Sequence, residues 1–101
     1  MKLYLISQTA NHDYDSFDSA VVAAENEANA REIHPSENSE LEWLHNNETG
    51  SFAWGRRRPN GIDFPYDSGD WVVPAKVTVE LIGNAKPGTL PGVICSSFNA
   101  G

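Results

Sequence analysis

Residues 18–35 constrain the fold of this chain more than any other stretch, because a strand pattern there passes almost directly into a capped helix. The β-branched pair Val21 and Val22, which lies between small residues, predicts a strand. Asn26 is a good helix N-cap, because its side-chain oxygen can accept a hydrogen bond from a backbone N–H one turn further on. Pro35 disfavours the helical conformation in the residue before it. A short helix is therefore expected between Asn26 and Pro35.

The remaining elements follow from apolar runs and from alternation of apolar with polar residues. These patterns predict strands over residues 1–8, 20–24, 51–56, 77–81 and 92–98. Ser39 and Glu42 match the spacing of a capping box. This match predicts a second helical segment over residues 40–46, whose Leu41 and Leu44 face inward.

The order of these elements predicts the class of fold. It indicates an α+β domain of two layers, with an antiparallel sheet of four to five strands and one or two short helices on one face. A chain of 101 residues lies near the common size of one domain. We therefore expect residues 1–101 to form a single domain around one core.

The charge of the chain is strongly uneven. The net charge is −7, and residues 1–50 hold ten acidic and two basic residues, whereas residues 51–101 carry a net charge of +1. An acidic field repels nucleic acid and membrane surfaces and attracts basic partners. No apolar run approaches the roughly 18 residues of a membrane span, and the N-terminus lacks a signal-peptide pattern. A soluble, cytoplasmic protein without membrane contact is expected.

The single cysteine, Cys95, cannot form an internal disulfide, which favours a reducing compartment. Its place beside Val93 and Ile94 in an apolar run predicts a buried thiol, because free cysteine is among the most buried residue types. No local signature of a nucleophilic cysteine surrounds it. Cys95 is therefore expected to belong to the core of a strand.

A cluster of polar residues near the N-terminus is the closest approach to a metal site. It consists of His12, Asp13, Asp15 and Asp18. Counted from Asp13, the spacing fails as an EF-hand at the sixth position, where Asp18 stands in place of the required glycine. Side chains that bond to the loop backbone are the favoured interpretation. The alternative interpretation is a small metal-dependent enzyme. However, the sequence holds none of the usual catalytic or phosphate-binding motifs. The favoured expectation is therefore a protein without catalytic activity and without a cofactor.

One basic patch interrupts the acidic chain, and it adjoins an aromatic residue. Trp54 is followed after one glycine by Arg56, Arg57 and Arg58. Arginine beside an aromatic side chain can grip phosphates and stack on bases, but the surrounding acidity argues against tight binding of nucleic acid. Three interpretations stay open: an exposed turn whose arginines pair with the protein's own acids, a protein-contact loop, or a nucleic-acid site. Trp54 and the three arginines are the candidate contact residues, because tryptophan and arginine are enriched at interface hot spots.

Several stretches resemble a group of short hypothetical proteins common in phage and prophage genomes. They are residues 1–8, 14–24, 30–35, 92–94 and 97–101. The group has no established activity, so the resemblance implies context alone: a phage-type accessory protein in a bacterial cytoplasm. By analogy with other small acidic phage proteins, we expect a non-enzymatic protein that binds a host or phage protein. An inhibitor of host defence machinery, of the anti-CRISPR kind, is one such class.

Overall fold

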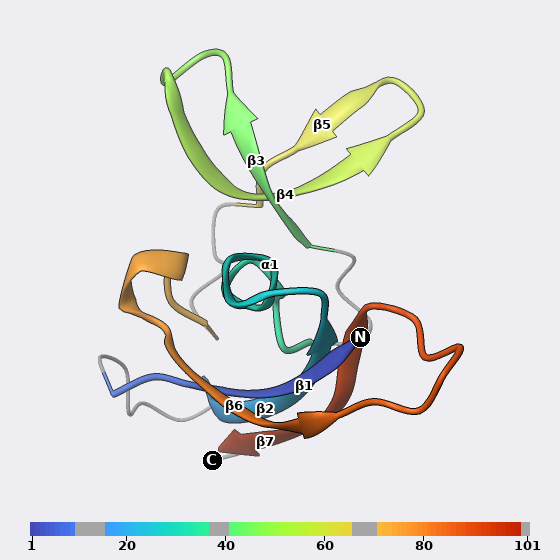
Figure 1. Ribbon diagram of the computed structural model, residues 1–101. Coiled ribbons are helices and arrows are strands. Elements are labelled where there is room, and N and C mark those ends of the chain that lie inside the picture. The colour runs from blue at the N-terminus through green and yellow to red at the C-terminus, as the bar shows by residue number, and fades with distance from the viewer. Residues whose placement is uncertain (10–15, 37–40, 66–70, 100–101) are drawn as a thin grey trace.

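The computed structural model describes residues 1–9, 16–36, 41–65 and 71–99 (Figure 1). This part of the chain is mainly antiparallel β-structure with one short α-helix. In chain order its elements are β1 (Lys2–Ser7), β2 (Ser16–Ala24), α1 (Glu27–Arg31), β3 (Glu42–Asn46), β4 (Ser51–Arg58), β5 (Gly61–Asp63), the 3₁₀ helix η1 (Pro74–Lys76), β6 (Thr78–Asn84) and β7 (Gly92–Asn99).

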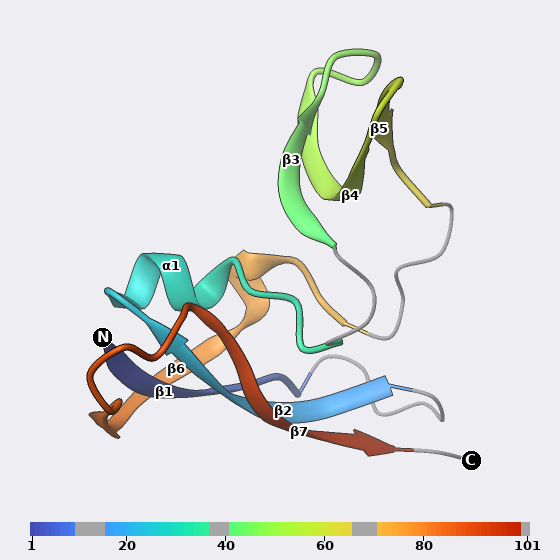
Figure 2. The same cartoon turned by 90° about the vertical axis from the view of Figure 1, so that its right-hand side faces the viewer.

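The strands form two separate sheets. The large sheet has the order β6-β1-β2-β7 and the small sheet the order β3-β4-β5, and each pair of neighbouring strands is antiparallel. The large sheet thus joins the two ends of the chain, whereas the small sheet comes from the segment between them. Helix α1 packs on one face of the large sheet, and Figure 2 shows the small sheet standing on that same side.

The expected fold class is confirmed in part. The large sheet has four antiparallel strands with α1 on one face, but the second sheet was not expected. The helical segment predicted over residues 40–46 is wrong for its described part, because Glu42–Asn46 is strand β3. Its backbone pairs with β4 from Glu42 opposite Gly55 to Asn46 opposite Ser51. This ladder satisfies the backbone groups that a helix would otherwise have paired internally.

Helix α1 begins after the predicted N-cap, Asn26, but it has only five residues and ends at Arg31, before Pro35 is reached. The Asn26 side chain accepts a hydrogen bond of 2.8 Å from the backbone N–H of Asn29. A helix this short is not stable alone and needs tertiary contacts. Arg31 supplies them, because its guanidinium donates hydrogen bonds to the backbone carbonyl of Val77 and, at 3.5 Å, to that of Pro74. Arg31 thereby ties α1 to η1 and to Val77, the residue before β6.

One core lies between the large sheet, α1 and the base of the small sheet. Its central side chains, Ile6 and Val22, are completely buried. The other buried members of this cluster are Tyr4, Phe17, Ala20, Ala24, Ala30, Trp54, Trp71 and Val77. The Trp54 side chain comes from β4, so this residue brings the small sheet into the same core as the large one.

Cys95 differs from its predicted position, because it is exposed. It lies opposite Val21 in the register of β2 and β7, whereas Val93, on the same strand, packs against the core. An apolar run therefore does not decide which face of a strand is covered. Within the described residues, no helix is long and apolar enough to cross a membrane.

Candidate functional site

A ladder of aromatic rings runs from the core to the free end of the small sheet. The His34 ring meets the Trp54 ring edge-on at 5.1 Å, and Trp54 meets Trp43 at 5.2 Å. Trp43 then stacks on Phe52, with ring centres 6.3 Å apart and planes inclined by 19°. Phe52 finally meets the His45 ring at 5.3 Å. The strand register explains this order, because Trp43 lies opposite Trp54 and His45 opposite Phe52 on one face of the hairpin.

The two ends of this ladder differ in exposure. Trp54 is only 4% exposed, and its indole N–H donates a hydrogen bond of 3.1 Å to the backbone carbonyl of Val72. Phe52, two residues earlier on the same strand, is 55% exposed. The structure thus places the predicted contact residue Trp54 in the core and Phe52 at the surface. The sequence signal for Phe52 was its alternation with Trp54, which puts both side chains on one face of β4.

The three predicted arginines lie on the last residues of β4 and not in a turn. Arg56 and Arg58 each approach Asp63 of β5 at 3.8 Å. Arg57 points to the other face, where it meets Glu42 of β3 at 3.2 Å. All three arginines therefore pair with acids of the protein itself, as one of the sequence interpretations proposed.

These ion pairs lie at the surface, where water screens them. The Arg57 side chain is 66% exposed and its Glu42 partner 51%. Exposed ion pairs contribute roughly 0–1 kcal/mol each to stability. A partner molecule could therefore draw a guanidinium away from its carboxylate at a small energetic cost.

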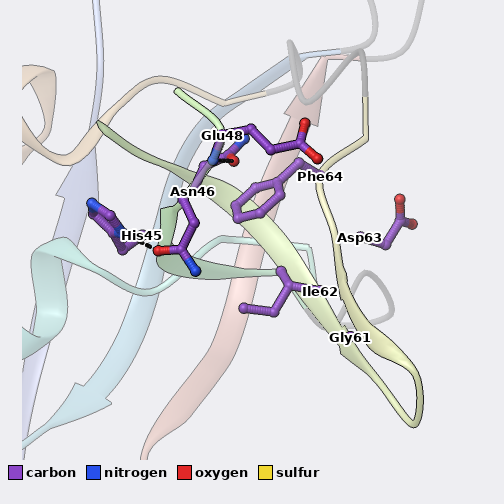
Figure 3. A pocket seen from close by; sticks show the side chains of 8 residues that line it. His45, Asn46, Glu48, Gly61, Ile62, Asp63 and Phe64 are labelled. Atoms are coloured by element: carbon purple, nitrogen blue, oxygen red, sulfur yellow. Dashed lines mark hydrogen bonds between the residues drawn. The ribbon is translucent and has the colours of Figure 1, made fainter. Parts of the chain in front are cut away.

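A pocket of about 570 Å³ lies between the β3–β4 turn and β5 (Figure 3). The Phe64 ring occupies its middle, with His45 and Asn46 on one side and Asp63 on the other. Its lining residues are His45, Asn46, Asn47, Glu48, Gly61, Ile62, Asp63 and Phe64. The described residues of this lining include none of the usual nucleophiles serine, threonine, cysteine or lysine. The pocket offers an apolar floor with imidazole, amide and carboxylate groups around it.

The turn beside this pocket is held by its own polar side chains. The Asn46 side-chain oxygen accepts a hydrogen bond of 3.0 Å from the backbone N–H of Glu48. A ring nitrogen of His45 and the side-chain oxygen of Asn47 are also 3.0 Å apart. Short side-chain bonds of this kind are typical of turns, since they replace backbone bonds that the turn cannot make. The pocket wall on this side is thus built by the turn itself.

Gly55 allows the Phe64 ring to lie against β4. A Cβ atom at this position would come within 2.8 Å of Phe64 Cε1 and 3.2 Å of Ile62 Cγ2. We expect Gly55→Ala to lower the free energy of unfolding by about 1–3 kcal/mol, because overpacking forces neighbouring side chains to shift. Urea denaturation measures this loss. In a Phe64→Ala background, the same change should cost less, and an equal cost in both backgrounds would contradict the contact.

The structure describes only one of the four candidate metal ligands. His12, Asp13 and Asp15 lie outside the described residues, whereas Asp18 is an exposed residue of β2. Across residues 1–9, 16–36, 41–65 and 71–99, no group of three or more histidine, cysteine, aspartate or glutamate side chains could hold a metal ion.

Comparison of this chain with protein-family models, curated proteins and solved structures finds no match. A functional assignment therefore depends on the surface chemistry described above.

Proposed function

We propose that this protein is a non-enzymatic accessory protein that docks on a protein partner through its small sheet. The observation that carries the proposal is Phe52, an apolar ring 55% exposed at the outer end of a ladder that begins in the core. Aromatic residues and arginine are enriched at protein interfaces, and Arg58, whose side chain is 48% exposed, lies on the same face of β4 as Phe52. Stacking on Trp43 already holds the Phe52 ring, so binding would cost it little conformational entropy.

The distribution of charge indicates the chemistry of the partner. Residues 41–65, which include the small sheet, hold three acidic and three basic residues, so the rest of the chain carries the whole net charge of −7. The acidic part of the chain outside residues 41–65 attracts a basic protein over a distance. The small sheet, which has no net charge, then makes close apolar contact through its aromatic side chains. The proposed partner is therefore a protein with an apolar pocket inside a basic surface. The resemblance to phage proteins suggests a bacterial host protein, including defence machinery.

Single-stranded nucleic acid is the second candidate partner, and one observation favours it. Phe52, Arg56 and Arg58 occupy alternate positions of β4 and so share a face. Stacking of bases on aromatic rings beside arginine is a common way to bind single strands. The pairing of both arginines with Asp63 and the net charge of −7 disfavour this candidate.

Replacing Phe52 by alanine is expected to weaken binding of the protein partner by roughly thirtyfold, a typical hot-spot loss of about 2 kcal/mol. The tagged full chain would first retain its partner from a bacterial host lysate, and calorimetry on the purified pair would then give the Kd. Leu81→Ala is the matched control, because Leu81 is equally exposed, at 57%, but lies on β6 of the large sheet.

Three results would contradict the proposal. One is a wild-type chain that retains no protein from several hosts, and another is a Phe52→Ala chain that binds as tightly as the wild type. The third is a complex that is disrupted by nuclease and does not form when Arg56, Arg57 and Arg58 are all replaced by alanine. This result would favour nucleic acid as the partner. For a protein complex, moderate salt should weaken binding, because it screens the attraction between the acidic body and a basic partner.

A further inference from the structure

A groove lies where the segment after α1 meets the start of β3. Ile33, which follows the helix, forms an isolated antiparallel bridge with Glu42 of β3, so these two segments run side by side. The groove consists of two hollows of about 350 Å³ and about 530 Å³. They adjoin each other, because Glu32, Ile33, Glu42 and Pro91 line both. The two hollows together are called here the helix-end groove.

The floor of the helix-end groove is apolar and is held by the core. Ile33, Leu41, Trp43 and Val93 line the groove, and each of these side chains is partly buried and packs against the core. Apolar surface that stays accessible in this way gains free energy when a partner covers it. Because packing already fixes the floor, binding would cost these side chains little conformational entropy.

The rim of the helix-end groove is acidic. Glu25 and Glu32 flank α1 and are both exposed, and Glu42 of β3 also lines the groove. Glu42 pairs with Arg57 at 3.2 Å, whereas neither Glu25 nor Glu32 has a basic partner in the described part of the chain. No lysine or arginine is among the described residues that line the groove. The groove therefore combines an apolar floor with carboxylates that lack a cation.

We infer that the helix-end groove binds an arginine-bearing segment of a protein, with the guanidinium groups at Glu25 and Glu32 and apolar groups on the floor. Charge complementarity selects this occupant, because a guanidinium makes strong hydrogen bonds to a carboxylate. The aliphatic stem of arginine also covers apolar surface while its charged end stays at the rim. A second copy of this chain does not fit, since its net charge is −7 and its arginines of β4 already pair with acids. The inference goes beyond docking through Phe52 and does not depend on it.

The test measures binding of the full chain to a short fluorescent peptide in which arginine and leucine alternate. Fluorescence anisotropy at about 0.15 M salt gives the Kd, because this salt screens charges more than about 8 Å away. The double variant Glu25→Gln, Glu32→Gln should raise the Kd about tenfold, since it removes two carboxylates and keeps the shape of both side chains. The matched control is Asp18→Asn, Glu80→Gln, which removes two exposed carboxylates of the large sheet outside the groove and should change the Kd less than twofold.

A second peptide, in which glutamine replaces every arginine, controls for the ligand and should bind at least tenfold more weakly. A wild type that does not bind the arginine peptide, equal binding of the two peptides, or equal effects of the two double variants would overturn the inference. Phe52→Ala should leave the Kd of the arginine peptide unchanged, and a loss equal to that of the groove variant would also overturn it. The groove and the docking proposed for Phe52 can thus fail separately, because the peptide measures the first and the captured protein partner the second.

Discussion

Replacement of Trp54 by alanine is expected to lower the free energy of unfolding by about 3–5 kcal/mol, the range for large aromatic side chains removed from a core. Trp54 is 4% exposed, contacts the rings of His34 and Trp43, and donates a hydrogen bond to Val72. Through these contacts it is the residue of β4 that joins the small sheet to the common core. Urea denaturation followed by circular dichroism measures the loss.

The same substitution should also reduce the cooperativity of unfolding. Without Trp54, the small sheet keeps its own strand pairings but loses its main anchor, so it should unfold before the large sheet. In a Trp43→Phe background, where Trp71 is the one tryptophan left in Trp54→Ala, fluorescence of Trp71 in the core and circular dichroism of all strands would then give different midpoints, which a two-state transition does not allow. Trp54→Phe is the control, because it keeps a ring and loses only the indole donor, at about 1 kcal/mol. Coincident midpoints in Trp54→Ala, with a loss below that of Trp54→Phe, would contradict this role.

Ile6→Ala is the second substitution with a large expected effect, a loss of about 2–5 kcal/mol. Ile6 is completely buried, at 0% exposure, and lies between Ala20 of β2 and Val79 of β6. Alanine would leave a cavity at the centre of the large sheet, and neighbouring strands that pair on both sides limit how far it can collapse. Thermal and urea unfolding both report this loss.

Leu81→Ala is the control for Ile6, since Leu81 faces the same side of the large sheet but is 57% exposed. Its replacement should change stability by no more than about 0.5 kcal/mol. In contrast to Trp54→Ala, Ile6→Ala should keep all probes coincident, because it weakens the core on which both sheets depend. Similar losses at Ile6 and Leu81 would show that the predicted core is in the wrong place.

Local patterns predicted the large sheet and its helix because each element carries its own signal. The apolar run of β1, the valine pair of β2 and the alternation in β6 report strands directly. The cap of α1 was also local, because Asn26 bonds to a residue only three positions away.

The small sheet was predicted only in part: the strand expected over residues 51–56 belongs to β4, whereas β3 and β5 were not expected. In residues 40–46, Leu41 and Leu44 have a spacing that suits a helix. The segment is too short to show whether this helical spacing continues over a further turn. Strand β3 forms because β4 pairs with it, and β4 in turn lies against the Phe64 ring at Gly55. These are contacts between segments, so no propensity within one segment reports them.

The sequence predicted correctly that arginine and aromatic side chains make up the candidate site, but it named the wrong aromatic residue. The arginines and their pairing with acids agree with the structure. The exposed ring is Phe52 and not Trp54, because both lie on one face and only the end near the large sheet is covered. Cys95 is exposed for a different reason: the register of β2 and β7 shifts between Val21 and Val22, so Cys95 and the core-packed Val93 do not share a face although they are two residues apart.

The segregation of the two sheets along the chain sets the order in which a ribosome can complete them. The small sheet uses residues 42–63 and is complete before β6 and β7 are synthesised. The large sheet must wait, because its central strands β1 and β2 gain their outer neighbours only from the C-terminal quarter of the chain. Until then the β1–β2 hairpin has two open edges, which are templates for pairing with other chains. A nascent chain of this protein is therefore most prone to aggregate between the emergence of β2 and that of β7.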